Sequence, residues 1–251
     1  MSSLTTASPD SGSQAGKLLF ALLASAALGV FFWHSWVLWP FKLLVVLMHE
    51  SGHAVATLLV GGHVQSISIS PDEGGMTWSA YQQTLPREVI VSSAGYVGST
   101  VSGCVLLWAA ARARTGKLAL YLLAGWTGLV ALLYVRDLFT LAFALGATAA
   151  LALCARFGAT RLRRLLIAFL AAFSVLYALF DIKDDLLHFH SSGGSDADAL
   201  ARVTLIPAIV WGVAWGLFAL VLVAFTLRGI FASEAGRSSA ATLSPRSRIG
   251  A

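Results

Sequence analysis

Two histidines and a glutamate in one short stretch, Met48-His49-Glu50-Ser51-Gly52-His53, have the residue types and spacing for metal chemistry. The stretch lies in an apolar run that indicates a helix, and residues four apart on a helix share one face. Two imidazoles can therefore chelate one zinc ion, while a glutamate beside the first histidine can activate a bound water. The spacing predicts His49 and His53 as zinc ligands and Glu50 as the catalytic general base.

The motif sits in a strongly apolar chain. Of its 251 residues, 57% are hydrophobic and only 12% are charged, which is more apolar surface than one soluble core can bury. An ionisable group at the centre of a spanning helix costs about 2.5 to 3.5 kcal/mol on insertion scales, so such groups are functional by default. Three of them within a turn and a half favour a catalytic site over histidines that only hydrogen-bond to neighbouring helices.

The chain is expected to be an all-α polytopic membrane protein with about six to seven transmembrane helices. Each apolar segment is close to the roughly 20 residues that a span requires. We expect a membrane metalloprotease domain over 17–231, between a flexible N-terminus, 1–16, and a flexible basic tail, 232–251. The seven predicted segments are 17–38, 41–60, 86–111, 117–135, 138–156, 164–187 and 203–230.

The segment Val64–Tyr81 follows the motif and differs from the apolar runs around it. Apolar and hydroxyl side chains alternate on both sides of the turn sequence Pro71-Asp72-Glu73-Gly74-Gly75. This pattern predicts a short β-hairpin after the catalytic helix. An unpaired strand edge could add an extended peptide beside the zinc, so we expect Ile67 and Ile69 to bind substrate.

The net charge of +5 does not indicate nucleic acid, because the cations form no patch interleaved with aromatics. They cluster in the short breaks 112–117 and 156–164, as in cytoplasmic loops of membrane proteins. We therefore expect a multi-pass protein of the bacterial cytoplasmic membrane, with both breaks inside and the N-terminus outside. Its partners would be the lipid bilayer and a membrane-protein substrate, with no nucleic acid.

Three features together resemble the site-two protease family of intramembrane zinc metalloproteases. They are the motif His49–His53 on an early membrane helix, the hairpin after it, and Ala94-Gly95-Tyr96-Val97-Gly98-Ser99 opening the next helix. The resemblance covers about Leu43 to Gly146 and implies a compact branch without a PDZ domain. It also implies a helical membrane core, a zinc cofactor, and hydrolysis of a peptide bond within or beside the bilayer. The chain has Tyr96 and Ser99 where the family usually has proline and asparagine.

A third zinc ligand must come from elsewhere in the fold, because a catalytic zinc usually has three protein ligands. We expect Asp137, the only acidic residue between Glu88 and Asp181, because it lies where two apolar segments meet. The resemblance also places an aspartate there, although here no glycine follows it. Asp181 is the alternative. We interpret Ser195-Asp196-Ala197-Asp198 as an ordinary helix cap.

The predicted function is zinc-dependent intramembrane endopeptidase, hydrolysing a bond in or near a transmembrane segment of a membrane protein. One alternative is a catalytically inactive scaffold or metal-binding protein with a protease-like core. Another is a transporter that uses Arg136, Asp137 and Asp181 as intramembrane charges, but the inverted repeats typical of transporters are not evident. The intact set of His49, Glu50 and His53 favours the enzyme.

Overall fold

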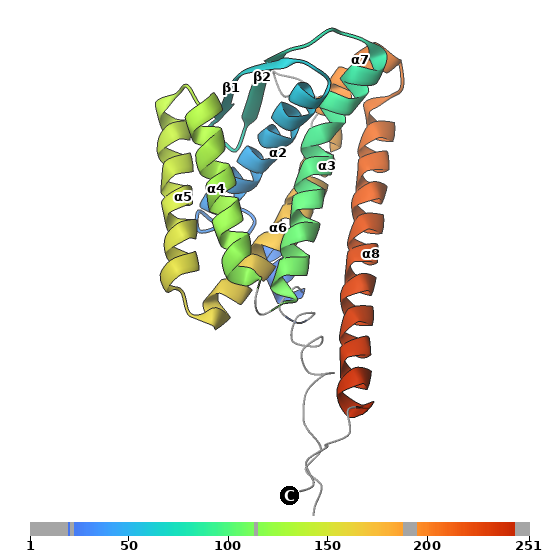
Figure 1. The fold of residues 1–251 in the computed structure, drawn as a ribbon. Helices are drawn as coiled ribbons and strands as arrows, with labels where there is room; N and C mark the ends of the chain where they lie inside the picture. The colour runs from blue at the N-terminus through green and yellow to red at the C-terminus, as the bar shows by residue number, and fades with distance from the viewer. Residues whose placement is uncertain (1–19, 21–22, 113–114, 188–194, 244–251) are drawn as a thin grey trace, which may run out of the picture.

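The apolar segments fold into a bundle of helices in a computed structural model of the chain (Figure 1). The structure describes residues 20, 23–112, 115–187 and 195–243. A helix over residues 23–31 precedes the main elements. The helices that follow are α2 (Trp39–Leu59), α3 (Leu85–Ala110), α4 (Gly116–Tyr134), α5 (Leu138–Phe157), α6 (Thr160–Leu187), α7 (Asp196–Thr204) and α8 (Ala208–Leu243).

Four helices in the described part of the chain are long and apolar enough to cross a membrane: α3, α4, α5 and the part Ala208–Ser233 of α8. The mostly helical, multi-pass class is therefore confirmed, whereas the count of six to seven spans is not. In α2 the apolar run is interrupted by the polar residues of the motif. Helix α8 continues past the predicted domain boundary at 231, and segment 1–16 lies outside the described residues.

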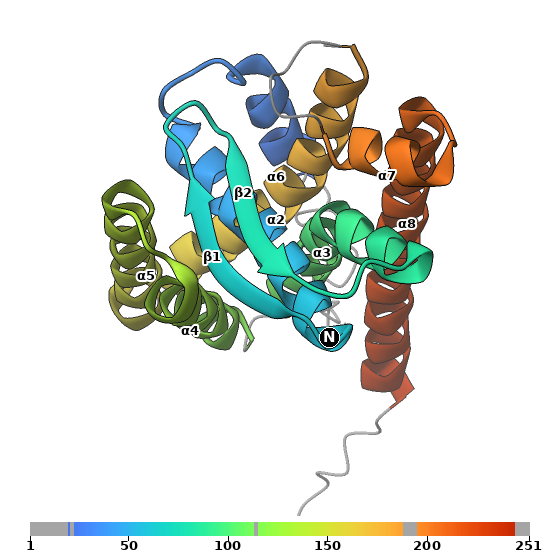
Figure 2. The same ribbon diagram turned by 90° about the horizontal axis from the view of Figure 1, so that it is seen from above.

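The predicted hairpin is present, with β1 (His63–Ile69) and β2 (Gly75–Ala80) paired antiparallel. A register shift between Val64 and Ser66 marks a bulge near its open end. Seen from above, the hairpin lies across α2 (Figure 2). Alternation therefore predicts this element correctly, because one face of β1 is buried against the helices.

The tip of the hairpin is tied to the first turns of α2. The Trp39 indole Nε1 donates to the Pro71 carbonyl oxygen at 2.7 Å. Lys42 Nζ lies 2.9 and 3.0 Å from the two carboxylate oxygens of Glu73, whose backbone adopts a left-handed φ of 72°. Lys42 is buried, so the ion pair holds the tip against the helix that carries the motif.

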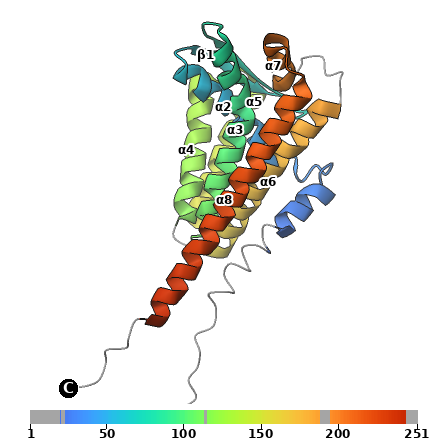
Figure 3. The same ribbon diagram turned by 90° about the vertical axis from the view of Figure 1, so that its right-hand side faces the viewer.

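Helix α3 is central to the bundle and packs against both α2 and α6. A Cβ atom on Gly52 of α2 would collide with the Ala94 carbonyl oxygen, so the two backbones meet closely there. Gly103 faces α6, where a Cβ would lie 3.2 Å from the Ala171 carbonyl oxygen. Helix α8 runs obliquely along this pair (Figure 3). These close approaches fix the spacing of the helices around the motif.

Candidate active site

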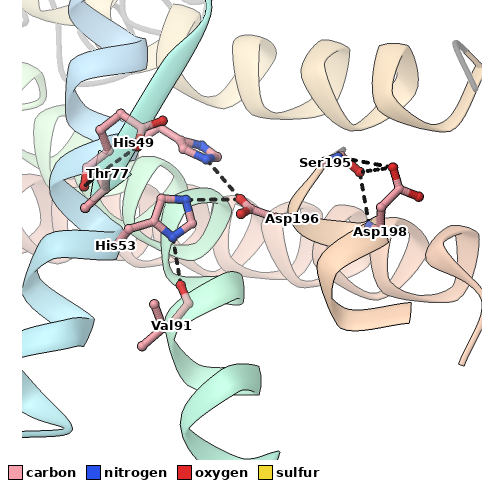
Figure 4. Close-up of polar contacts among 8 residues, drawn as sticks. His49, His53, Thr77, Val91, Ser195, Asp196 and Asp198 are labelled. Atoms are coloured by element: carbon pink, nitrogen blue, oxygen red, sulfur yellow. Dashed lines mark hydrogen bonds and ion pairs between the residues drawn. The ribbon is translucent and has the colours of Figure 1, made fainter. Parts of the chain in front are cut away.

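The motif residues converge on the face of α2 that lies under the hairpin (Figure 4). One potential ligand atom from each of His49, Glu50 and His53 lies within 4.8 Å of the other two. Glu50 and His53 are only 6% and 8% exposed. The helical spacing thus does what the sequence predicts: it brings the three side chains together in a sheltered place.

A fourth residue reaches the pair from a distant part of the chain. Asp196, the first residue of α7, places Oδ2 3.2 Å from His49 Nε2 and 3.1 Å from His53 Nε2 (Figure 4). Burial alone would favour the neutral carboxyl, but the charges and hydrogen bonds of the two imidazoles lower the pKa of Asp196 below its ordinary value. The carboxylate is therefore ionised and directed at the point where both Nε2 atoms meet.

The segment around Asp196 is also a helix cap, as the sequence predicts. The Ser195 hydroxyl accepts from the Asp198 backbone N–H, and the Asp198 carboxylate accepts from the Ser195 N–H, which completes a capping box. Capping thus occupies Ser195 and Asp198 and leaves the carboxylate between them available. Asp196 was not predicted as a ligand, because the sequence of the whole segment is typical of a helix cap.

The structure does not bring Asp137, the predicted third ligand, to the histidine pair. Asp137 is the N-cap of α5, and its Oδ1 accepts from the Thr140 backbone N–H at 2.8 Å. It is not among the residues that line the cavity at the motif. In the structure Asp137 caps α5, and Asp196 is the carboxylate that lies at the two histidines. The side chain of the alternative, Asp181, lies outside the described residues.

Hydrogen bonds hold the side chains of His53 and Glu50 in place. His53 Nδ1 lies 2.8 Å from the Val91 carbonyl oxygen, so Nδ1 carries a proton and donates to it, and the other ring nitrogen, Nε2, is directed at Asp196. Thr77 Oγ1 lies 2.7 Å from Glu50 Oε2 and 2.9 Å from the Glu50 carbonyl oxygen. The Thr77 hydroxyl can therefore donate to the carboxylate and fix its rotamer, leaving Oε1 for other partners.

Two glycines leave room for these side chains. A Cβ on Gly95 would collide with Nε2 of both His49 and His53, and a Cβ on Gly75 would collide with Oε1 of Glu50. Gly95 therefore lets α3 approach the imidazoles, and Gly75 lets the hairpin backbone pass over the carboxylate.

An aromatic stack supports the far side of His49. The Tyr96 ring stands edge-on to the His49 ring with centroids 4.8 Å apart, and Trp215 of α8 stacks on Tyr96 at 4.7 Å. Tyr96 is 3% exposed, so the stack is part of a packed core. Tyr96 occupies one of the places at which the sequence departs from the site-two protease pattern.

The site opens into a cavity of about 320 Å³. Its walls come from α2, the hairpin turn and β2, the first turns of α3, the C-terminal part of α6, and the start of α7. The lining residues include His49, Glu50, His53, Gly75, Thr77, Ser79, Tyr81, Val91, Ser92, Tyr96, Tyr177 and Asp196. A cavity of this size, lined by polar and aromatic side chains, has room for water and for part of a larger ligand beside the two histidines.

Ile67 and Ile69, the predicted substrate-binding residues, are 0% and 5% exposed and do not line this cavity. The outer edge of β1 is already occupied: Ile67 forms an isolated bridge with Val135, and the Ile69 N–H donates to Thr140 Oγ1 at 2.9 Å. Both side chains instead pack in the core beneath the hairpin. The hairpin residues that line the cavity belong to the turn and to β2.

The donor set and its spacing fit zinc. Bond lengths of about 2.0 to 2.2 Å in a tetrahedral site put neighbouring ligand atoms about 3.3 to 3.6 Å apart. The 3.1 and 3.2 Å separations of Asp196 Oδ2 from the two Nε2 atoms are only slightly shorter, so a small outward movement would admit an ion. Two imidazoles and one carboxylate are also ligands that zinc accepts. Residues present in this chain can therefore hold the metal.

Together, the helical membrane fold and the buried cluster of His49, Glu50 and His53 define a membrane protein with a centre of the metallopeptidase type. The model of the Peptidase M50B-like family matches residues 22–226. The chain belongs to this family, which confirms its predicted relation to the site-two proteases, and membership implies a membrane metalloprotease. No curated protein and no solved structure matches the chain.

Proposed function

We propose that the chain is a zinc-dependent intramembrane endopeptidase that cleaves a membrane protein in or near a transmembrane segment. His49, His53 and Asp196 would hold the zinc, and Glu50 would be the general base. The observation that carries the proposal is the single carboxylate oxygen of Asp196 within 3.2 Å of both imidazole Nε2 atoms. Family membership and the buried, water-accessible cavity support the same reading.

The proposed chemistry is addition of water to a peptide carbonyl followed by loss of the amine. Zinc, when bound, would polarise the carbonyl and lower the pKa of a water molecule in the open coordination position. Glu50, held by Thr77, takes the proton from the attacking water as the new C–O bond forms. Glu50 then delivers that proton to the amide nitrogen as the C–N bond breaks, so the carboxylate is regenerated.

The substrate must present an extended peptide, because a helix keeps its carbonyl groups in backbone hydrogen bonds. We propose that it pairs with the outer edge of β2, which has no strand partner among the described residues and borders the cavity. Adjacent strand residues direct their N–H groups to opposite edges. Proline at whichever of Trp78 and Ser79 directs its N–H outward should therefore impair cleavage with metal content and thermal stability kept, whereas proline at the other position also breaks a β1–β2 hydrogen bond and should lower stability. Unchanged cleavage in both variants would contradict strand pairing.

The decisive substitution for the enzyme assignment is Glu50→Gln. The amide cannot accept a proton from water, but it keeps the size of the side chain and is not needed to hold the metal. We expect the purified variant to bind zinc as the parent does and to lose cleavage of a membrane substrate. Cleavage within about tenfold of the parent would contradict the proposed role of Glu50.

A catalytically inactive, metal-binding scaffold is the alternative function. It would share the metal ligands but would need neither Glu50 nor the hydrogen bond from Thr77. The buried carboxylate of Glu50 beside the two histidines favours the enzyme, because a buried acid is costly to keep without use even with one hydrogen bond to it. If the parent binds zinc and cleaves no membrane protein, the scaffold function is the better reading.

A further inference from the structure

The helix over residues 23–31 lies beside α6 (Figure 3). The two helices touch at Gly29, where a Cβ would lie 3.2 Å from Leu176 Cδ1 and 3.4 Å from Phe173 Cδ2. Nearer the start of each helix, a cavity of about 1300 Å³ lies between them, and residues from 35–41 form its third wall. None of its lining residues lines the cavity at the metal site. It is therefore a separate candidate binding site.

The walls of this cavity are apolar except for two serines and one arginine. The lining residues are Phe20, Ala24, Ser25, Leu28, Phe32, Ser35, Val37, Leu38, Phe41, Arg161, Leu162, Leu165, Leu166 and Phe169. Along α6 the wall extends over eight residues, from Arg161 to Phe169, which is about 12 Å at 1.5 Å per residue. Phe20 and Leu162 are 74% and 55% exposed, so the cavity is open at one side. Its shape and lining suit a hydrocarbon chain.

Arg161 is the only cation among the described residues that line the cavity. Its side chain is exposed and forms no hydrogen bond or ion pair with any residue that the structure describes. Arg163 differs, because its guanidinium donates to the Ala155 carbonyl oxygen at 3.2 Å and to Thr160 Oγ1 at 3.1 Å. Arg161 also stands in the first turn of α6, where the helix dipole favours an anion. An unpaired positive charge therefore borders an apolar cavity.

The parts of the chain that form the cavity contain no acidic residue. Neither 20–49 nor 138–180 includes an aspartate or a glutamate. Helix α8 also packs on α6 and carries one acid, Glu234, but no described residue of α8 lines the cavity. Charge complementarity at Arg161 therefore calls for an anion from outside the chain.

A second apolar cavity, of about 470 Å³, adjoins the first and lies between α5, α6 and the start of α2. Phe41 and Leu166 line both cavities. The other residues that line the smaller cavity are Pro40, Leu44, Ala142, Phe143, Gly146, Ala147, Ala150 and Leu151. The two cavities thus provide two apolar spaces on either side of one pair of side chains, which suits a ligand with two hydrocarbon chains.

From the unpaired cation and the two adjoining apolar cavities we propose that this chain binds an anionic diacyl phospholipid between the helix over residues 23–31, α2 and α6. The phosphate contacts Arg161 and the first turn of α6, and one acyl chain lies in each cavity. Basic pockets between transmembrane helices bind anionic head groups in the same manner. A zwitterionic lipid carries an ammonium group that Arg161 repels, so the site selects lipids with a net negative head group.

Lipid binding to the purified full-length protein tests the proposal without any protease substrate. Phosphatidylglycerol, phosphatidylcholine with the same acyl chains, and oleate are each titrated into the protein in detergent, and bound lipid is counted by native mass spectrometry. We expect phosphatidylglycerol to bind at least about tenfold more tightly than either of the others. Equal binding of phosphatidylcholine would overturn the role of the anionic head group. Oleate that binds as tightly as phosphatidylglycerol would overturn the assignment to a lipid with two chains.

Substitutions separate the head-group contact from the apolar cavity. Arg161→Gln should abolish the preference for phosphatidylglycerol, whereas Leu165→Trp fills the larger cavity and should weaken binding of both phospholipids. Arg156→Gln is the matched control, because Arg156 lies over the Phe157 ring, does not line either cavity, and should be dispensable for binding. Thermal unfolding shows whether each variant is folded. A preference that survives in Arg161→Gln, or that Arg156→Gln abolishes equally, would overturn the proposed site. If Arg161→Gln does not fold, Leu165→Trp decides, and binding as tight as in the parent overturns the proposal.

Discussion

Gly95→Ala should remove metal binding while leaving the fold nearly intact. The added Cβ would lie about 1 Å inside ordinary contact distance of Nε2 on both His49 and His53. The helices cannot part easily, because Gly52 already packs its backbone against the Ala94 carbonyl oxygen. The two imidazole side chains can move more easily than the helix backbones, so they should rotate away from the added methyl group. His53 can do so only by giving up its 2.8 Å hydrogen bond to Val91.

The expected loss of stability is much smaller than the expected loss of cleavage. Overpacking of a core typically costs about 1 to 3 kcal/mol, and alanine recovers up to about 1 kcal/mol of helix propensity over glycine. The folded state should therefore survive. A displacement of about 1 Å in a catalytic group costs on the order of a hundredfold in rate, and two ligands move here. Cleavage should fall at least a hundredfold and zinc content should fall with it.

Gly98→Ala, one turn further along α3, is the matched control. Its Cβ would lie 3.3 Å from the Gly52 Cα, a contact that a shift of a few tenths of an ångström relieves. Zinc content by mass spectrometry, cleavage of a membrane substrate and thermal unfolding are measured for both variants. If Gly95→Ala keeps its zinc and its cleavage rate is within about tenfold of that of Gly98→Ala, the reasoning is refuted.

Two further predictions concern the hairpin. Thr77→Val removes the donor to Glu50 but keeps the branched shape, so kcat should fall by about tenfold to a hundredfold, as expected for a hydrogen bond to a charged group; unchanged kcat with normal zinc content would count against a positioning role. Lys42→Met should destabilise the protein by about 1 to 2 kcal/mol, because Glu73 is left unpaired but remains 30% exposed at its side chain and is partly screened. Adding Glu73→Gln should restore much of that loss in thermal unfolding, and an additive further loss would contradict the pairing.

Local patterns predicted the parts of the site that lie close together in sequence. The spacing of His49, Glu50 and His53 is a helical period, so the shared face follows from geometry. The alternation from Val64 to Tyr81 likewise predicted the hairpin, because β1 buries one of its faces. The number of membrane spans could not be predicted as well from local patterns. Helix α2 is long enough to be a span, but it contains the polar residues of the site.

The third carboxylate could not be found in the same way. Asp196 is 147 residues from His49, and the packing of α7 on α3 and α8 brings them together. Asp137 was a reasonable expectation because it is an isolated acid between apolar segments, but in the structure it caps α5 through Oδ1 instead of reaching the histidines. The useful signal was an extra acid in a cap: Ser195 and Asp198 suffice for the capping box, so the carboxylate between them has no local role.

The edge of the hairpin shows a second limit of sequence patterns. Alternation identifies which face of β1 is apolar, but it does not say which edge is covered. The contacts of Ile67 with Val135 and of Ile69 with Thr140 come from a connection more than sixty residues further along the chain. The strand whose edge borders the cavity is therefore β2, which the sequence alone did not distinguish from β1.

The central claim is that His49, His53 and Asp196 hold a catalytic zinc, and metal content in two aspartate variants tests it most directly. Asp196→Ala and Asp137→Ala are purified beside the parent, and zinc per chain is measured after removal of loosely bound metal. We expect stoichiometric zinc in the parent and in Asp137→Ala, which loses only a helix cap worth about 1 kcal/mol. Asp196→Ala should lose most of its zinc while staying folded. Full zinc in Asp196→Ala, or its loss in a folded Asp137→Ala, would contradict the assignment.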